Sequence, residues 1–192
     1  MEERRIRRTK NAFKMHFIAL VKQKGYQAVT VTDIVDRADY NRSTFYVYYL
    51  DKEDLAQQLL EEMMHLLKKS FREPFQVNTE VPYQKIENRN HNTFFNHLYE
   101  HRHFYELLVV SDTLPQLNER FLEQFKGLFS SMLFLDEQKN IITVNHYNEY
   151  KMYGSYGVIL EWIKRGFSEK PEQISATLLS IFKTTASSFR FI

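Results

Sequence analysis

The sequence predicts an all-α protein, and three observations support this fold class. The 192 residues include only 5 Gly and 4 Pro, which argues against a β-sandwich, a β-barrel or a Gly-rich nucleotide-binding fold. Apolar residues recur at intervals of three and four along most of the chain. The longest apolar stretches, such as 107–110 and 156–160, are far shorter than the 18 or so residues that a membrane span needs. We therefore expect about nine helices and no strand.

The composition also limits the compartment and the chemistry. The chain has no cysteine, which excludes disulfides, thiolate zinc sites and cysteine nucleophiles and suits a reducing compartment. Lys14 and His16 interrupt the first apolar segment, and no small-residue cleavage site follows, so the N-terminus does not resemble a secretory signal. These features predict a cytoplasmic protein.

Four helices are expected in the first third of the chain. The first is about 20 residues long and stops at Gly25. Thr30, with Asp33 three residues later, is expected to cap a short second helix. Asn41 is expected to cap a third helix from Arg42 to about Tyr48, and Asp51 a long fourth one. Their apolar stripes are Ile6, Phe13, Phe17, Leu20 and Val21; Val31, Ile34, Val35 and Ala38; Phe45; and Leu55, Leu59, Met63, Leu66 and Leu67.

The remaining helices follow two expected loops, at 72–89 and 136–143. Helical faces begin at Phe94 and Phe104, and Pro115 is expected in the first turn of the next helix. A helix from about Tyr147 should stop near Gly166, and Pro171 should open the last one, whose stripe is Ile174, Leu178, Ile181, Phe182, Thr185 and Phe189.

The charge is distributed unevenly. Residues 1–50 hold 10 Lys and Arg against 5 Asp and Glu, whereas residues 51–192 hold 16 against 19. A basic segment of this kind suits a polyanion such as DNA, although it is also compatible with an ordinary solvated face. The basic residues are densest at the start, at Arg4, Arg5, Arg7, Arg8 and Lys10.

The segment 30–52 has the pattern of a helix-turn-helix. Ile34, Val35 and Ala38 would face Phe45 across the short turn Asp39-Tyr40-Asn41. The second helix would then present Arg42, Ser43 and Thr44 to base edges in the major groove. Tyr46 and Tyr48 would place hydroxyl groups near the flanking backbone, and Lys52 would meet a phosphate at the start of the fourth helix.

At these residues the sequence resembles the TetR family of bacterial transcriptional regulators. The matching residues are Gly25-Tyr26, 31–35, 38–46, Tyr49 and 52–55. The resemblance implies a homodimer with a DNA-binding domain at 1–50 and a helical regulatory and dimerisation domain at 51–192. It also implies that DNA faces seven side chains: Thr32, Arg42, Ser43, Thr44, Tyr46, Tyr48 and Lys52.

Two residues depart from the family pattern. The family often has Gly where Asp39 stands, but Asp tolerates a left-handed backbone better than most residues. It often has Ser or Thr where Asn41 stands, and Asn caps helices equally well. Residues 162–167, followed by Pro171-Glu172, resemble the C-terminal region of a TetR subgroup common in Firmicutes that includes dihydroxyacetone-kinase-type regulators.

The C-terminal region offers candidates for a ligand site and a dimer seam. Aromatic residues from 94 to 162 are dense enough to line a pocket for an apolar or aromatic ligand, although each is also compatible with core packing. The ligand candidates are Phe95, His97, Tyr99, Phe104, Phe125 and Tyr153. Glycines inside a helix suggest close helix approach, so the dimer candidates are Gly154, Tyr156, Gly157, Ile159, Trp162, Leu178, Ile181 and Phe182.

The sequence thus predicts a ligand-responsive, dimeric DNA-binding regulator of palindromic operators, most simply a repressor, with no cofactor and no membrane partner. Two alternatives remain open. One is a TetR-like coactivator or adaptor that acts through a protein partner without a small ligand. The other is a metal-dependent enzyme that uses His97, His101 and His103, of which the first two share a helix face.

Overall fold

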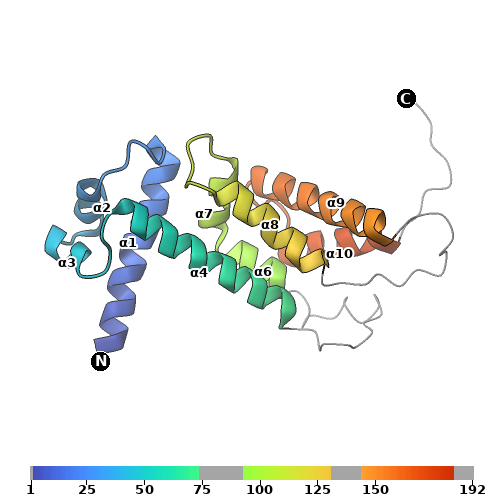
Figure 1. The fold of residues 1–192 in the computed structure, drawn as a ribbon, viewed down its shortest axis with the longest axis horizontal. Helices are drawn as coiled ribbons and strands as arrows, with labels where there is room; N and C mark the ends of the chain where they lie inside the picture. Colours follow the sequence, from blue (N-terminus) through green and yellow to red (C-terminus); the bar gives the residue numbers. More distant parts are fainter. Residues whose placement is uncertain (1, 74–92, 131–143, 184–192) are drawn as a thin grey trace. The chain divides into compact units, whose positions relative to one another are not determined.

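The computed structural model describes residues 2–73, 93–130 and 144–183 (Figure 1). These residues form nine α-helices and one short 3₁₀ helix, without a strand, as the sequence predicts. Among them, no helix combines the length and the hydropathy that a membrane crossing requires. The helices are α1 (Glu2–Lys24), α2 (Val31–Ala38), α3 (Arg42–Tyr46), α4 (Lys52–Arg72), α6 (Thr93–Glu100), α7 (Arg102–Tyr105), η2 (Glu106–Val109), α8 (Leu117–Ser130), α9 (Val144–Lys164) and α10 (Pro171–Lys183).

The chain divides into two compact units. The first unit contains Met1–His65 and Arg102–Arg120, and the second contains Leu66–His101 and Phe121–Ile192. The helices α4 and α8 each continue from one unit into the other. These two units are defined by which residues pack together and not by function. The functional domains expected at 1–50 and 51–192 stay a prediction.

The first unit is centred on the aromatic face of α1. Phe13 and Phe17 have no exposed surface, and neither have Ile34 of α2 and Phe45 of α3. The rings of Phe13 and Phe45 meet edge to face, with their centroids 5.4 Å apart, a geometry that favours aromatic pairs beyond their burial alone. This packing fixes α2 and α3 against α1.

A distant segment completes the first unit. The carbonyl of Asp112 accepts a hydrogen bond from Tyr26 N–H at 2.9 Å, and its carboxylate accepts one from Gln27 N–H at 3.0 Å. Lys22 of α1 also pairs with Glu106 of η2. The loop after α1 is therefore anchored by residues about 85 positions later in the sequence.

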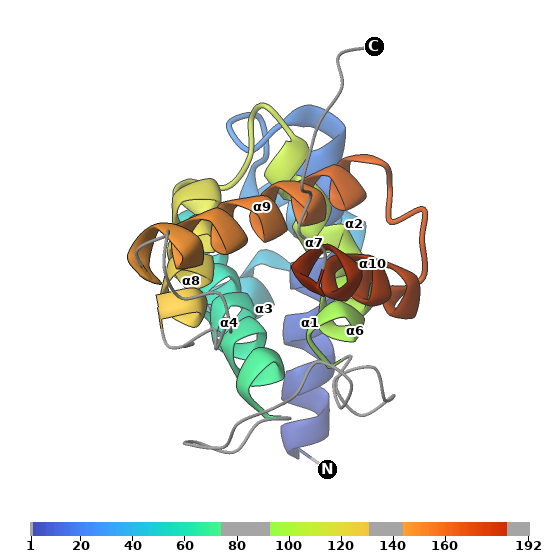
Figure 2. The same ribbon diagram turned by 90° about the vertical axis from the view of Figure 1, so that its right-hand side faces the viewer.

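The second unit is built around α9. Trp162 has no exposed surface, and its indole N–H donates to the carbonyl of Glu169 at 3.0 Å. α10 packs against α9 and α6 (Figure 2). The end of α9 is near the predicted stop: Gly166 has φ +68°, and Phe167 N–H bonds back to the carbonyl of Trp162 at 2.9 Å.

Two boundaries differ from the sequence prediction. α8 begins at Leu117, so Pro115 precedes the helix instead of occupying its first turn, because Gln116 adopts φ +61° between them. α3 ends at Tyr46, and the next two residues form a turn. The loops expected at 72–89 and 136–143 fall almost wholly outside the described residues, and Thr185 and Phe189 lie outside them entirely.

Candidate nucleic-acid interface

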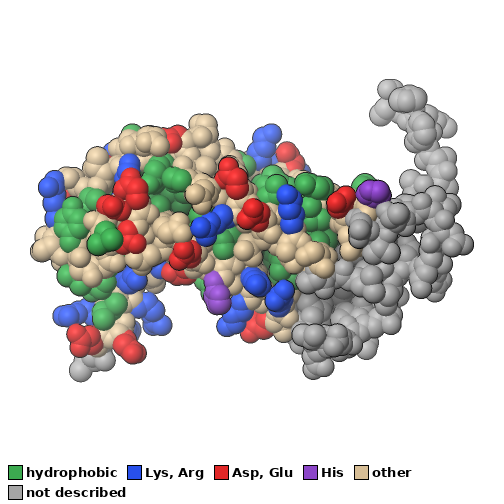
Figure 3. All heavy atoms as spheres, in the orientation of Figure 1, with side chains coloured by type: hydrophobic (Ala, Val, Ile, Leu, Met, Phe, Trp, Pro, Cys, Tyr) green, Lys and Arg blue, Asp and Glu red, His purple; other side chains and the backbone are tan. Residues whose placement is uncertain are grey.

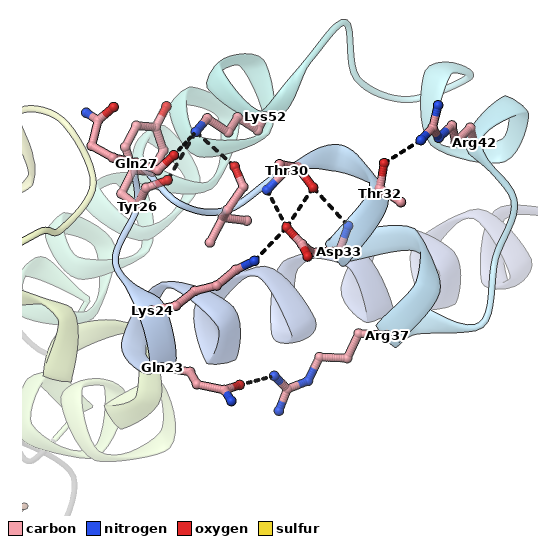
Figure 4. Close-up of polar contacts among 11 residues, drawn as sticks. Gln23, Lys24, Tyr26, Gln27, Thr30, Thr32, Asp33, Arg37, Arg42 and Lys52 are labelled. Carbon is pink, nitrogen blue, oxygen red and sulfur yellow. Dashed lines mark hydrogen bonds and ion pairs between the residues drawn. The ribbon is translucent and has the colours of Figure 1, made fainter.

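A complete capping box begins α2. Thr30 Oγ1 accepts from Asp33 N–H at 3.2 Å, and the Asp33 carboxylate accepts from Thr30 N–H at 2.7 Å (Figure 4). Lys24 contacts the same carboxylate at 2.7 Å. The hydrogen bond from Lys24 contributes most to lowering the pKa of Asp33 to about 2, and the two hydrogen bonds from Thr30 contribute next. The carboxylate is therefore a firm anchor between the C-terminus of α1 and the start of α2.

The turn between α2 and α3 has the expected geometry. Asp39 adopts the left-handed conformation with φ 58° and ψ 46°, and its N–H bonds back to carbonyls at the end of α2. The next N–H, of Tyr40, donates to the carbonyl of Val35 at 3.0 Å. Asn41 is extended and caps α3 by accepting from Thr44 N–H at 2.9 Å.

The start of α3 carries an ordered row of polar side chains. The Ser43 and Thr44 hydroxyls each lie 2.7 Å from Asn41 Oδ1, to which both donate. The Arg42 guanidinium donates to Thr32 Oγ1 of α2 at 2.5 Å (Figure 4). Each hydroxyl keeps acceptor capacity, and the guanidinium keeps further donors. The side chains of Arg42 and Ser43 are exposed, and that of Thr44 is half-buried.

Apolar side chains extend this surface beyond α3. Tyr46 is 55% exposed, Val47 72% and Leu50 81%, whereas Tyr48 is half-buried. The sequence reasoning missed Val47 and Leu50. A signal was present in the sequence. Val47 and Leu50 follow the core residue Phe45 by two and five residues, spacings that do not place them on the same face of a helix, so two large apolar side chains have no expected place in the core.

Lys52 is engaged within the protein. Its ammonium donates to the carbonyls of Tyr26, Gln27 and Val29 at 3.1, 3.2 and 2.9 Å (Figure 4). It also lies 4.6 Å from the centroid of the Tyr26 ring. Only 16% of its side chain is exposed, so this cation ties the loop before α2 to the start of α4.

The six ligand candidates do not gather in one unit. Phe104 belongs to the first unit and the other five to the second. Phe125 is in the core, where its ring meets those of Phe94 and Tyr156 with centroids 5.8 and 5.4 Å apart. Tyr153 is 52% exposed. His97 is buried, which lowers its pKa to about 4. Phe95 is half-buried against Trp162, and Tyr99 lies beside Phe167.

The dimer candidates separate into core and surface residues. Ile159, Trp162 and Leu178 are buried inside the second unit. Tyr156 and Phe182 are half-buried. Gly154, Gly157 and Ile181 are exposed, and a Cβ added at either glycine would meet nothing within 4 Å.

The three histidines of the metal hypothesis are divided between the units. The rings of His97 and His101 lie in the second unit, tilted to one another with centroids 4.6 Å apart, whereas His103 contacts Glu106 in the first. In the described part of the chain, no three His, Cys, Asp or Glu side chains are grouped so that they could hold a metal ion.

Comparisons with known proteins agree with this architecture. Residues 18–59 match the family of bacterial regulatory proteins named tetR, and residues 90–184 match a transcriptional regulator C-terminal region of the TetR type. A curated relative, the uncharacterized HTH-type transcriptional regulator YxbF of Bacillus subtilis (strain 168), is 26% identical over 165 residues. That match covers 84% of this chain and 41% of the relative, so the chain spans less than half of the relative's length.

Solved structures share the fold. The dihydroxyacetone kinase operon activator DhaS is 22% identical with a TM-score of 0.59, covering 91% of this chain and 94% of its own. The fatty acid degradation regulator FadR from Bacillus halodurans is 15% identical with a TM-score of 0.65, covering 90% and 93%. A TetR regulator from Streptococcus agalactiae 2603V is 22% identical with a TM-score of 0.59, covering 94% and 96%. The two family matches and the helix-turn-helix described above lead to one conclusion: the chain belongs to the TetR family and is a transcriptional regulator with a DNA-binding domain.

Proposed function

We propose that this regulator binds a palindromic operator as a homodimer, with α3 in the major groove. The observation that carries the proposal is the row of polar side chains at the start of α3, in which Asn41 holds Ser43 and Thr44 in place. Side chains that are already ordered lose less conformational entropy when they bind. Base edges in the major groove present the donors and acceptors that such a row would read.

The proposed roles divide by chemistry. Arg42 would bind a guanine in a bidentate manner, and Ser43 and Thr44 would bond a base or a phosphate. Thr32 would orient Arg42 through their hydrogen bond, while Tyr46 and Tyr48 would contact the flanking backbone. For Lys52 we propose an indirect role, because its ammonium already serves three carbonyls. It would hold the start of α4, because the N-terminus of a helix suits a phosphate.

The proposed dimer seam is the exposed face of α9. Tyr150, Tyr153, Gly154 and Gly157 recur at helical spacing, and all four are exposed. Two aromatic rings beside two glycines suit the close approach of a second helix, and the exposed Ile181 of α10 would extend the contact. To read two half-sites one turn of DNA apart, such a twofold pair would have to hold its two α3 helices about 34 Å apart.

Regulation is proposed to act through α4, which continues from the first unit into the second. An apolar or aromatic ligand bound among the aromatic residues of the second unit would favour one conformation of α4 and thereby change affinity for DNA. We propose repression as the simplest direction of this regulation, although one similar solved structure is named as an operon activator.

The test is a selection from a pool of random DNA duplexes by the purified chain. We expect enrichment of two inverted half-sites, and we expect the chain to run as a dimer in light scattering. Arg42→Ala combined with Tyr46→Ala should abolish enrichment, while Lys126→Ala, at an exposed cation of α8, should leave it intact. A pool without enrichment would refute the proposal.

Gly154→Arg provides the test of the seam. Arginine has a higher helix propensity than glycine, so the substitution should not disturb the folding of α9. A variant that folds normally, is monomeric and retrieves no palindrome would support α9 as the interface. The matched control is Gly127→Arg, because Gly127 is also an exposed helical glycine at which an added Cβ would meet nothing within 4 Å. If both variants remain dimeric, the seam lies elsewhere.

A second candidate function is regulation by a protein partner instead of a small ligand. The observation in its favour is the aromatic packing at Phe125, which contacts Phe94, Phe121 and Tyr156 with centroids 5.1–5.8 Å apart. A core filled in this way leaves less room for a ligand. Native mass spectrometry of the purified chain distinguishes the two, because a bound small molecule would favour the sensor and a bare chain the adaptor.

A further inference from the structure

Four arginines lie in the first two turns of α1: Arg4, Arg5, Arg7 and Arg8. We call them the α1 arginine cluster. All four are exposed. Figure 3 shows basic side chains around this end of α1, with acidic ones at its tip. The proposed roles of the helix-turn-helix residues do not involve them, so their presence needs a separate explanation.

The cluster differs from the other cations of α1 in its partners. Lys14, Lys22 and Lys24 form ion pairs with Glu62, Glu106 and Asp33, and Lys10 contacts the Gln58 amide. Within the described residues, the four side chains of the cluster form no hydrogen bond or ion pair. No described carboxylate pairs with the cluster, and Glu2 and Glu3 in the first turn of α1 balance only part of its charge, so this end of the helix keeps a net positive charge.

The cluster is also electrostatically unfavourable for α1 itself. Cations in the first turns of a helix oppose its macrodipole. Arg4 and Arg8 are four residues apart, and Arg4 and Arg7 are three apart, spacings at which like charges repel. Glu2 and Glu3 offset part of this cost, because they complement the macrodipole and precede Arg5 and Arg7 by three and four residues. The remaining excess of cations is one that a bound polyanion would relieve.

The position of the cluster indicates which polyanion fits. Thr9 Oγ1 lies 3.4 Å from the Tyr40 hydroxyl in the turn of the helix-turn-helix. At a rise of about 1.5 Å per residue, Arg4 lies about 7.5 Å further along the axis than Thr9. Figure 1 shows these first turns of α1 extending beyond α2 and α3, which belong to the same unit. The cluster thus lies next to the proposed reading surface and outside it.

The apolar face of α1 argues against an anionic membrane as the partner. Phe13 and Phe17 have no exposed surface, and an interfacial helix needs its apolar face free to enter the lipid. The exposed guanidinium groups alone suit phosphates, which they bind through paired N–H donors.

We propose that the α1 arginine cluster binds phosphates of the operator duplex outside the base pairs that α3 reads. This inference rests on the proposed DNA binding. It assigns to α1 a second contact, which lengthens the footprint of each subunit and supplies affinity without sequence preference.

The test compares the wild-type chain with R4Q/R5Q/R7Q/R8Q in fluorescence anisotropy. The probes are the duplex obtained by the selection, trimmed to its half-sites, and the same duplex lengthened by about one turn at each end. If each arginine binds one phosphate, the slope of log K against log salt should become shallower by about 3.6 per subunit. Only the wild-type chain should bind the longer duplex more tightly, and base preferences should not change.

Two further variants make the result specific. K68Q/K69Q/K126Q/K164Q removes the same charge from exposed positions elsewhere and should change the slope less, while R4K/R5K/R7K/R8K should restore it. Each of three results would overturn the inference. The control could change the slope as much as the glutamine variant does, the glutamine variant could keep the wild-type slope or alter the base preferences, or the lysine variant could fail to restore the slope. If the wild-type chain enriched no duplex, the proposed function itself would have failed.

Discussion

Substituting Lys52 by Met separates a structural cation from one that binds DNA. The Met side chain keeps most of the aliphatic stem but has no donor for the carbonyls of Tyr26, Gln27 and Val29. The bonds to Tyr26 and Val29 are partly buried, whereas the one to Gln27 is exposed and can be replaced by water. Two partly buried carbonyls therefore lose a charged donor in the variant.

The size of the effect follows from these two bonds. A hydrogen bond to a charged group contributes about 1.5–3 kcal/mol, and regained hydration of the carbonyls offsets part of the loss. We expect the free energy of unfolding to fall by about 3 kcal/mol. In a chain of this size that corresponds to a decrease in Tm of about 6–12 °C.

The assay is thermal unfolding followed by circular dichroism, with binding to the selected duplex measured below the transition. Lys126→Met, at an exposed position of α8, is the control and should change stability by no more than about 0.5 kcal/mol. A Lys52→Met chain with the wild-type Tm but uniformly weaker binding to all duplexes would refute the reasoning. The ammonium would then be a phosphate ligand, as the sequence pattern alone suggested.

Three other predictions concern the first unit. Gly25→Ala should lower the free energy of unfolding by about 2 kcal/mol or more, measured by urea titration, because Gly25 has φ +81° and an added Cβ would overlap the Asp112 carboxylate. Asp33→Asn should cost about 1 kcal/mol at pH 7 after allowance for solvent screening. The pKa of Asp33 is lowered in the folded state, so this difference should persist above about pH 4 and disappear as the pH falls towards 2. Arg42→Ala should weaken operator binding by about 1–3 kcal/mol and relax one base position, measured by anisotropy across single-base operator variants; equal loss on every variant would contradict a base contact.

The parts of the fold that the sequence predicted are those set by local chemistry. The capping box of Thr30 and Asp33, the left-handed Asp39 and the cap Asn41 all act on backbone groups within three or four residues. Such features depend on short spacings that can be read directly from a sequence. The end of α9 near Gly166 and the start of α10 at Pro171 are predictable for the same reason.

Contacts across long separations could not be predicted in this way. The acceptors of Lys52 lie 23–26 residues earlier in the chain, and no pattern near Lys52 indicates them. The periodicity around Trp162 shows that one face of α9 is buried, but the same pattern fits burial in the subunit's own core or against a second copy. The structure buries Trp162 and Ile159 in the core and leaves Gly154 exposed, and the seam that we propose is therefore on the exposed face of α9.

The anchoring of the loop after α1 by Asp112 has a consequence for protein engineering. The first unit is not a contiguous stretch of sequence, because residues 102–120 are part of its fold. A chimera that joins residues 1–50 to the body of another regulator would lose the acceptors of Tyr26 and Gln27. Module exchange in this protein must therefore carry the distant Asp112 segment along with the first four helices, or supply a substitute for it.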